Sequence, residues 1–142
     1  MFTYICFGTN NIANSAKFYD ATLGALGISR CTSTEEPNWN GWVGWGIYEN
    51  NGLTELALWL CEPFNGQPAT VGNGTMVALQ AKTWSEVDAF YSAAMANGGQ
   101  SEGEPGLRPQ YNDDFYAAYV RDPDGNKLAA VCRGMSKPQG ES

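Results

Sequence analysis

In the first half of the chain, the spacing of hydrophobic residues changes from every second position to every third or fourth position. Over residues 3–8 every second side chain is apolar, with Ile5 and Phe7 on one face, and this alternation predicts a strand. From residue 12 onward, apolar side chains recur every three or four positions, which predicts a helix that ends at Gly27. Further strands are predicted over residues 28–33, 41–48 and 55–61, with a polar loop at 35–41 and a turn at 50–52.

The same order of elements returns in the second half, after a segment at residues 62–74 that is rich in Gly, Pro and Asn. A strand is predicted over residues 75–81, and the sequence Thr83–Glu86 is a capping box that starts a helix. Gly98 and Gly99 end that helix. Three strands follow at residues 101–104, 115–121 and 127–132, with a loop at 105–114 and a hairpin turn at 122–126.

The two halves match each other. Phe18 falls on Phe90 and Leu23 on Met95, so both pairs are 72 residues apart. Each half is too small to bury its sheet alone, and the match therefore indicates an internal duplication. We expect one domain over residues 1–134, built from modules at 1–62 and 72–134. A linker at 63–71 joins them, and residues 135–142 form a flexible tail.

Composition narrows the chemistry. The 142 residues include no histidine, which excludes imidazole metal ligands and every Ser-His or Cys-His nucleophile pair. The net charge is −7 and no run of Lys or Arg occurs, so we expect no nucleic-acid partner. No apolar run reaches membrane-spanning length, and we expect neither a membrane partner nor a secretory signal. The four cysteines form no C-x-x-C pair and are expected to be reduced thiols of a cytoplasmic protein.

Three phrases, in order, resemble those of one known family. Residues 17–27 look like its first helix, and residues 63–74 look like its inter-module linker. The strongest phrase is Tyr116–Lys127, with the sequence Y-A-A-Y-V-R-D-P-D-G-N-K. Over residues 2–133 the chain therefore resembles the glyoxalase/bleomycin-resistance/dioxygenase superfamily, also called the vicinal oxygen chelate superfamily.

The resemblance implies an α+β fold. Two tandem βαβββ modules form a curved mixed sheet with an internal cleft, and the helices lie outside. Small molecules bind in the cleft of such proteins, often over a divalent metal, and many members are homodimers. We therefore expect a small-molecule ligand and a second copy of the chain as partners. Whether modules pair within one chain or between two chains stays open.

The resemblance also implies where a metal would sit. Its ligands, usually His and Glu, come from the first and last strands of each module, and the matching positions are Tyr4, Ala57, Met76 and Ala129. A divalent metal needs several oxygen or imidazole ligands, which this set does not supply. Glu55 lies two residues from Ala57 on the same strand face, but one carboxylate makes a poor site. We expect no metal and no cofactor.

The cleft itself is expected to be aromatic, with few charges. Its expected lining is Tyr4, Cys6, Trp42, Trp45, Glu55, Ala57, Trp59, Met76, Arg108, Tyr111, Tyr116 and Ala129. Each position also has an ordinary structural interpretation. Tyr4 and Cys6 fit half-buried packing, and the two tryptophans among glycines at 41–46 fit a strand packed closely against its neighbour. Arg108 suits either a carboxylate or phosphate ligand or a surface ion pair.

Three functions remain open. The first is metal-free binding of a small molecule, as in the bleomycin-resistance members of the family. The second is a lyase, isomerase or dioxygenase of the superfamily with an atypical site, in which Tyr4 or Glu55 acts as acid or base. The third is a degenerate module that only dimerises. Stabilisation by a bound ligand separates the first from the third.

Overall fold

The computed structural model describes residues 1–31 and 41–134, and their elements follow the duplicated order. The predicted polar loop at 35–41 and the tail at 135–142 fall almost wholly outside the described residues. The first module contains β1 (Tyr4–Gly8), α1 (Ile12–Ala25), β2 (Val43–Glu49), a 3-10 turn (Asn50–Gly52) and β3 (Thr54–Cys61). The second contains β4 (Met76–Gln80), α2 (Trp84–Ala96), β5 (Gln100–Leu107), β6 (Tyr116–Arg121) and β7 (Lys127–Cys132). The predicted α+β fold of two modules is confirmed.

Each module has its own mixed sheet. The first has the order β1-β3-β2 and the second the order β4-β7-β6-β5. In both, the first strand runs parallel to the last, and the remaining pairs are antiparallel. The strand predicted over residues 28–33 is reduced, in its described part, to a single bridge between Arg30 and Trp45. By contrast, β5 is longer than predicted and includes Pro105–Leu107, with two register shifts along it.

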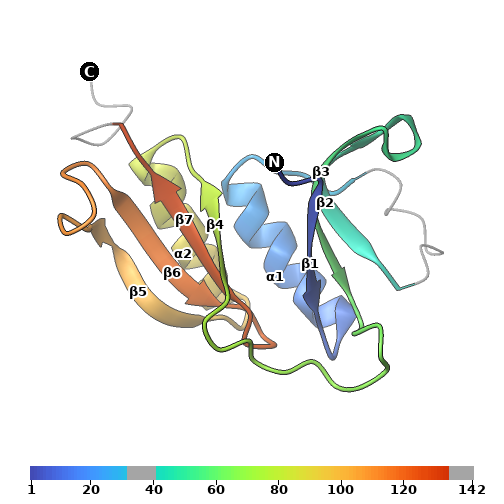
Figure 1. Ribbon diagram of the computed structural model, residues 1–142. Helices are drawn as coiled ribbons and strands as arrows, with labels where there is room; N and C mark the ends of the chain where they lie inside the picture. Colours follow the sequence, from blue (N-terminus) through green and yellow to red (C-terminus); the bar gives the residue numbers. More distant parts are fainter. Residues whose placement is uncertain (32–40, 135–142) are drawn as a thin grey trace.

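The two helices pack against each other at the centre of the folded molecule (Figure 1). Helix α1 lies between the first sheet and α2, and α2 packs on β5, β6 and β7 (Figure 1). Phe18 and Phe90, the 72-residue pair, are both fully buried in one core that both helices share. Each helix thus packs on the core side of its sheet and lies outside the opposite face, as the predicted fold requires. Each sheet buries one face against this core, and we call its opposite face the open face.

The helix starts follow from local polar chemistry. Asn11 precedes α1, and its side chain accepts a hydrogen bond from the backbone N–H of Asn14 over 3.0 Å. Thr83 caps α2 in the same way through the N–H of Glu86, also over 3.0 Å. The Glu86 carboxylate accepts the N–H of Lys82, which completes the predicted capping box one residue early.

The duplication is not in register throughout. In the first sheet Tyr4 lies beside Ala57, whereas in the second Ala78 lies beside Ala129. Met76, which the 72-residue offset matches to Tyr4, lies two residues before Ala78 on β4, beside Lys127. The match of Met76 to the inner position is thus corrected to Ala78. A shift of two residues leaves each side chain on its original face, so the hydrophobic pattern does not reveal it.

The predicted hairpin turn at residues 122–126 also joins the modules. The buried carboxylate of Asp122 accepts the backbone N–H groups of Asp124 and Asn126, each over 2.9 Å. Its other oxygen accepts the Tyr19 hydroxyl of α1 over 2.5 Å. The Asn126 side chain donates to the carbonyl of Gly8 at the end of β1. The 122–126 turn of the second module therefore binds to α1 and to the end of β1 in the first module.

Burial makes this junction sensitive to charge. Burial raises the pKa of Tyr19 well above its ordinary value, and the neighbouring Asp122 carboxylate adds to the shift. Burial also raises the pKa of Asp122, although hydrogen bonds from Tyr19 and Asn126 act in the opposite direction. Both groups favour one protonation state, a neutral phenol that donates to a carboxyl oxygen.

Candidate ligand-binding faces

The open face of the first module carries several of the predicted cleft residues. Tyr4 lies beside Ala57 and Cys6 beside Trp59 on adjacent strands, so all four project from the same face. Tyr4 and Cys6 are exposed, and Trp59 is only 4% exposed. Glu55 shares this face, and its carboxylate accepts the indole N–H of Trp59 over 2.8 Å. The structure thus brings five predicted residues together.

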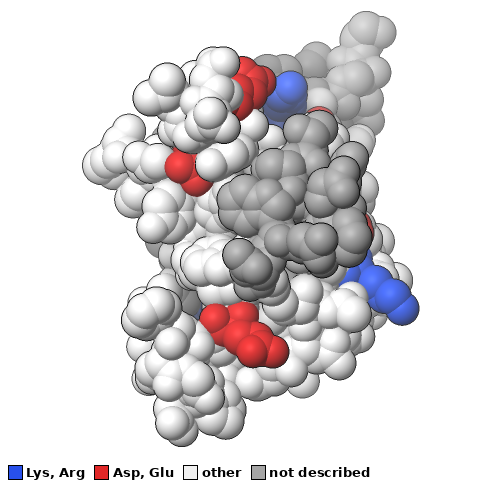
Figure 2. Space-filling view, turned by 90° about the vertical axis from the view of Figure 1, so that its right-hand side faces the viewer, with Lys and Arg blue, Asp and Glu red and all other residues white. Residues whose placement is uncertain are grey.

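Trp59 is the centre of an aromatic cluster on that face. Its ring lies edge-on to Trp42 at 6.4 Å and to Tyr48 at 5.6 Å between centroids. Gly44 makes the arrangement possible, because a Cβ at that position would lie 2.5 Å from the Trp59 ring. The glycines between the tryptophans therefore serve close packing, and Trp42 joins the open face through its contact with Trp59. In the view of Figure 2 the described residues on this side are mostly uncharged, with scattered acidic and basic side chains among them.

Two thiols lie next to this cluster. The Sγ atoms of Cys6 and Cys61 are 3.6 Å apart, with Cys6 exposed and Cys61 buried. Burial, together with the hydrogen bond to Cys6, raises the pKa of Cys61 to about 12. Cys61 is therefore a neutral thiol at physiological pH and not an activated nucleophile.

Two predicted cleft residues lie on the helix-facing side of their sheets, although Trp45 still lines an apolar groove between the modules. Trp45 lies beside Leu58 on the helix-facing side, where it is fully buried and its indole donates to Asp20 over 2.9 Å. Tyr116 also faces the core: its ring stacks on Trp84 at 4.3 Å, and its hydroxyl donates to Asp88 over 2.6 Å. Strand alternation explains both corrections, since Trp45 is an odd number of residues from Trp42.

Among the described residues, the open face of the second module carries positively charged side chains, unlike that of the first. Ala129 is fully buried there, beside Tyr119 of β6. The guanidinium of Arg108 and the ammonium of Lys127 lie over the Tyr119 ring, at 5.5 and 5.7 Å from its centre. Tyr119 and Lys127 were not among the predicted residues. The signal was available, because Lys127 is two residues from Ala129 and so shares its face.

The loop after β5 borders the same face. Tyr111 is exposed, and its ring lies 5.2 Å from that of Phe115. The guanidinium of Arg133 lies over Phe115 at 4.6 Å. A second hollow of about 320 Å³ lies here and is lined by Gln80, Phe115, Val131 and Arg133, among others. Arg108, Tyr111 and Ala129 thus belong to one side of the molecule, and Tyr116 does not.

The family's metal position does not fit a metal in this chain. The inner pairs are Tyr4 with Ala57 and Ala78 with Ala129, which together offer a single phenol. Glu55 is engaged with Trp59, and no group of three or more His, Cys, Asp or Glu side chains converges within residues 1–31 and 41–134. Divalent metals need more oxygen or nitrogen ligands than this. The donor set therefore argues against the metal chemistry that the family implies.

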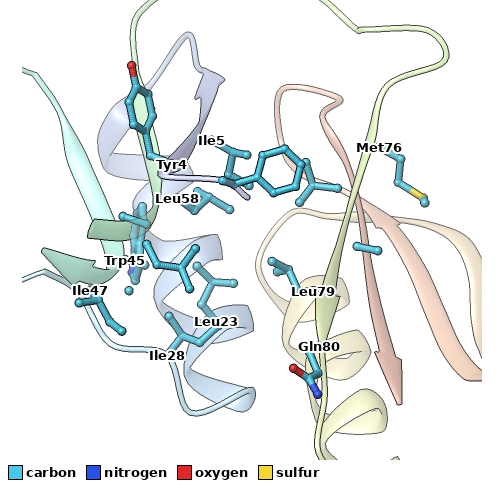
Figure 3. Close-up of a pocket in the computed structure, with 16 residues that line it drawn as sticks. Tyr4, Ile5, Leu23, Ile28, Trp45, Ile47, Leu58, Met76, Leu79 and Gln80 are labelled. Atoms are coloured by element: carbon cyan, nitrogen blue, oxygen red, sulfur yellow. The ribbon is translucent and has the colours of Figure 1, made fainter. Parts of the chain in front are cut away.

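An apolar groove lies between the two modules, and four residues of the predicted cleft line it: Tyr4, Trp45, Ala57 and Met76. It has a volume of about 540 Å³ and runs between β1 and β4, with the end of α1 as its floor (Figure 3). Its walls come from both modules, with Ile5 and Leu58 on one side and Leu79 on the other. Among the described residues β1 pairs only with β3, and β4 only with β7, so each strand presents an edge without a strand partner there. Leu56 is 58% exposed and Met76 43% exposed along this groove.

Two duplicated modules with helices on one face of each sheet define a fold of the glyoxalase type. The model of the Glyoxalase/Bleomycin resistance protein/Dioxygenase superfamily matches residues 2–130. The chain therefore belongs to this superfamily. None of its helices, within the part that the structure describes, is long and apolar enough to cross a membrane.

Solved structures agree. The chain is 37% identical to a glyoxalase/bleomycin resistance protein from Albidiferax ferrireducens T118, over 94% of this chain and 99% of that one, with a TM-score of 0.80. A glyoxalase-related enzyme from Fulvimarina pelagi (18% identity, 94% and 88% coverage, TM-score 0.68) shares the fold. So does lactoylglutathione lyase from Agrobacterium tumefaciens (17% identity, 93% and 92% coverage, TM-score 0.58). No curated protein matches the chain significantly.

Proposed function

We propose that this chain is a metal-independent small-molecule-binding protein that uses the open faces of its sheets and works as a homodimer. The observation that carries the proposal is the inner strand pairing, in which Tyr4 with Ala57 and Ala78 with Ala129 replace ligand-type side chains. Binding of an organic molecule needs apolar and aromatic surface with a few polar groups, and both open faces supply this.

The aromatic cluster supports the first module's part in binding. Trp59 is fixed by Trp42, Tyr48 and the hydrogen bond to Glu55, so its position does not depend on a ligand. Because only 4% of Trp59 is exposed, it serves as the rigid base of this surface, and a surface on a rigid base loses little conformational entropy when a ligand binds. Tyr4 and Cys6 extend this surface outward and are exposed.

The inter-module groove supports the homodimer. Soluble monomers rarely expose a large apolar surface beside unpaired strand edges. A second copy of the chain that covers β1 and β4 removes both features. Because the helices occupy the centre of one chain, a cleft that faces two sheets towards each other also requires sheets from two copies. We place this dimer in a reducing compartment, the cytoplasm, which suits the Cys6 and Cys61 thiols.

A thermal-shift survey tests the binding function. Purified protein is heated with a panel of small aromatic and polar molecules, once with excess EDTA and once with Mg²⁺, Mn²⁺ or Zn²⁺. We expect some compounds to raise the Tm equally with EDTA and with metal, by mass action. Stabilisation only in the presence of a metal supports the lyase or dioxygenase alternative, and no stabilisation by any compound supports a dimerisation module.

A further inference from the structure

Cationic side chains are few in this chain and unevenly placed. There are 8 Lys and Arg residues against 15 Asp and Glu. Lys127 projects from the open face of β7, and Arg133 follows six residues later, with the same strand parity. Arg121 lies beside Lys127 on β6, and Arg108 lies over Tyr119. Half of the cationic residues of an acidic chain thus gather on one face of the second module.

Arg108 is held in place by the shape of β5. A Cβ on Gly103 would lie 3.2 Å from Nη2 of Arg108, and a Cβ on Gly106 would lie 3.2 Å from Nη1. Neither glycine has a positive φ, so their missing side chains serve space and not a turn. One guanidinium N–H donates to the carbonyl of Glu104 over 2.7 Å. The two glycines thus form a cradle that holds the guanidinium against Tyr119, with further N–H donors still available.

Three of these cations form no ion pair in the described part of the chain, although the charge of Lys127 adds to the effect of Arg121 in lowering the pKa of Glu102. Arg121 pairs with Glu102 over 2.7 Å, and the other ion pair of the described residues is Arg30 with Asp20. Arg108, Lys127 and Arg133 instead lie over aromatic rings. Burial and, to a smaller extent, Tyr111 raise the pKa of Tyr119, and the charges of Arg108 and Arg133 offset only part of this shift.

We propose that Arg108 and Lys127, which lie over Tyr119, bind the carboxylate or phosphate group of an aromatic small molecule, and that Arg133, over Phe115, adds positive charge at the border of the same surface. The inference rests on the proposed binding function and names the ligand class. Charge-assisted hydrogen bonds from Arg and Lys are the strong ones for oxyanions, and the neighbouring tyrosine and phenylalanine rings suit an aromatic body. The acidic net charge alone favours a cationic ligand, but the placement of the charges favours an anionic one.

Four probes that share a phenyl ring test the inference: benzoate, phenyl phosphate, benzyl alcohol and benzylamine. Each is titrated into ¹⁵N-labelled protein at low salt while backbone amide resonances are followed. We expect benzoate or phenyl phosphate to shift amides of β6 and β7 around Tyr119 saturably. The Kd of that anion is expected to be at least about tenfold lower than the Kd of benzyl alcohol or of benzylamine. It is also expected to rise with added NaCl. The two anions show whether carboxylate or phosphate is preferred.

Variants locate the site. Arg108→Gln and Lys127→Gln are each expected to raise the Kd of the bound anion about tenfold, the loss of one charge-assisted hydrogen bond. Lys82→Gln, which removes an exposed cation at the start of α2, is the matched control and leaves the Kd unchanged. If Arg108→Gln perturbs the fold, Arg133→Gln tests the same surface instead, because Arg133 lies just after the end of β7.

The outcomes separate the two proposals. If benzyl alcohol or benzylamine shifts the same amides with an equal or lower Kd, the inference of an anionic ligand is wrong while the binding function stands. If both anions shift amides outside the surface around Tyr119, the proposed site is wrong. It is also wrong if Lys82→Gln raises the Kd of the anion as much as Lys127→Gln does. If no probe binds, and none of the compounds in the thermal-shift survey does either, the binding function fails with it.

Discussion

Tyr19 of the first module donates a buried hydrogen bond of 2.5 Å to Asp122 of the second. Tyr19→Phe removes the donor and leaves a buried carboxylate with one partner fewer, so we expect a loss of about 1–3 kcal/mol in the free energy of unfolding. Urea denaturation measures it. Tyr91→Phe, at the position 72 residues further along, serves as the control and is expected to cost less. Equal losses in the two variants contradict a special role for the junction.

The same tyrosine predicts a loss of stability at alkaline pH. Its pKa in the folded protein is raised above the ordinary value of 10.0, so its contribution is fully present below pH 10 and is lost as the pH rises beyond that value. Above pH 10 the unfolded chain releases a proton that the folded chain retains. Denaturation midpoints between pH 8 and pH 11 should therefore fall more steeply for the native protein than for Tyr19→Phe. Parallel curves contradict the assignment.

Gly44 is required by the Trp59 ring and not by backbone strain. Gly44→Ala places a Cβ 2.5–2.9 Å from three atoms of the indole, so the ring must move, and we expect a cost of roughly 1–3 kcal/mol. Tryptophan fluorescence and thermal denaturation measure the two effects. Gly24→Ala is the control, because nothing lies within 4 Å of its Cβ in helix α1 and the change is expected to stabilise by about 0.5–1 kcal/mol. A neutral Gly44→Ala contradicts the packing account.

One cysteine of the four should react readily. Cys6 is exposed, whereas burial raises the pKa of Cys31, Cys61 and Cys132 above the ordinary thiol value. Ellman's reagent at pH 8 is expected to modify one thiol rapidly in the folded protein and all four in denaturant. Cys6→Ser should abolish the fast phase. A fast phase that survives this change shows that another thiol is accessible.

The apolar groove predicts how the dimer is broken. Leu56→Glu places a charge among exposed apolar side chains between β1 and β4 and should shift the chain towards monomer in size-exclusion chromatography with light scattering. Leu53→Glu is the matched control: Leu53 is 89% exposed and lies outside the groove. A native protein that is monomeric at micromolar concentration contradicts the proposed assembly.

Local patterns predicted the elements well because they depend on neighbouring residues. The helix starts at Asn11 and Thr83 and the turn at 122–126 follow from side chains that bond their own backbone. The sequence could not predict that Ala78, and not Met76, pairs with Ala129. An alignment of the two modules does not show how their strands pair.

The candidate site was predicted in part. Strand alternation correctly groups Tyr4, Cys6 and Trp59, and the same rule, applied fully, separates Trp45 and Tyr116 from them. The cationic surface needed the structure, since Arg108 and Lys127 are distant in sequence and meet only over the Tyr119 ring. Tyr4, Ala57 and Met76 of the predicted lining reach the inter-module groove, but its position between β1 and β4 could not be predicted, because no periodicity connects the two modules in space.

Native mass spectrometry of untagged protein, purified without a chelator, tests metal-independent binding most directly. The account predicts a dimer whose mass contains no stoichiometric divalent metal, because Tyr4, Ala57, Ala78 and Ala129 supply too few ligands. Retention of an organic acid on that dimer adds direct support. A dimer that carries one divalent metal per chain contradicts the account and directs attention to Glu55 and to the metal-dependent reactions of the superfamily.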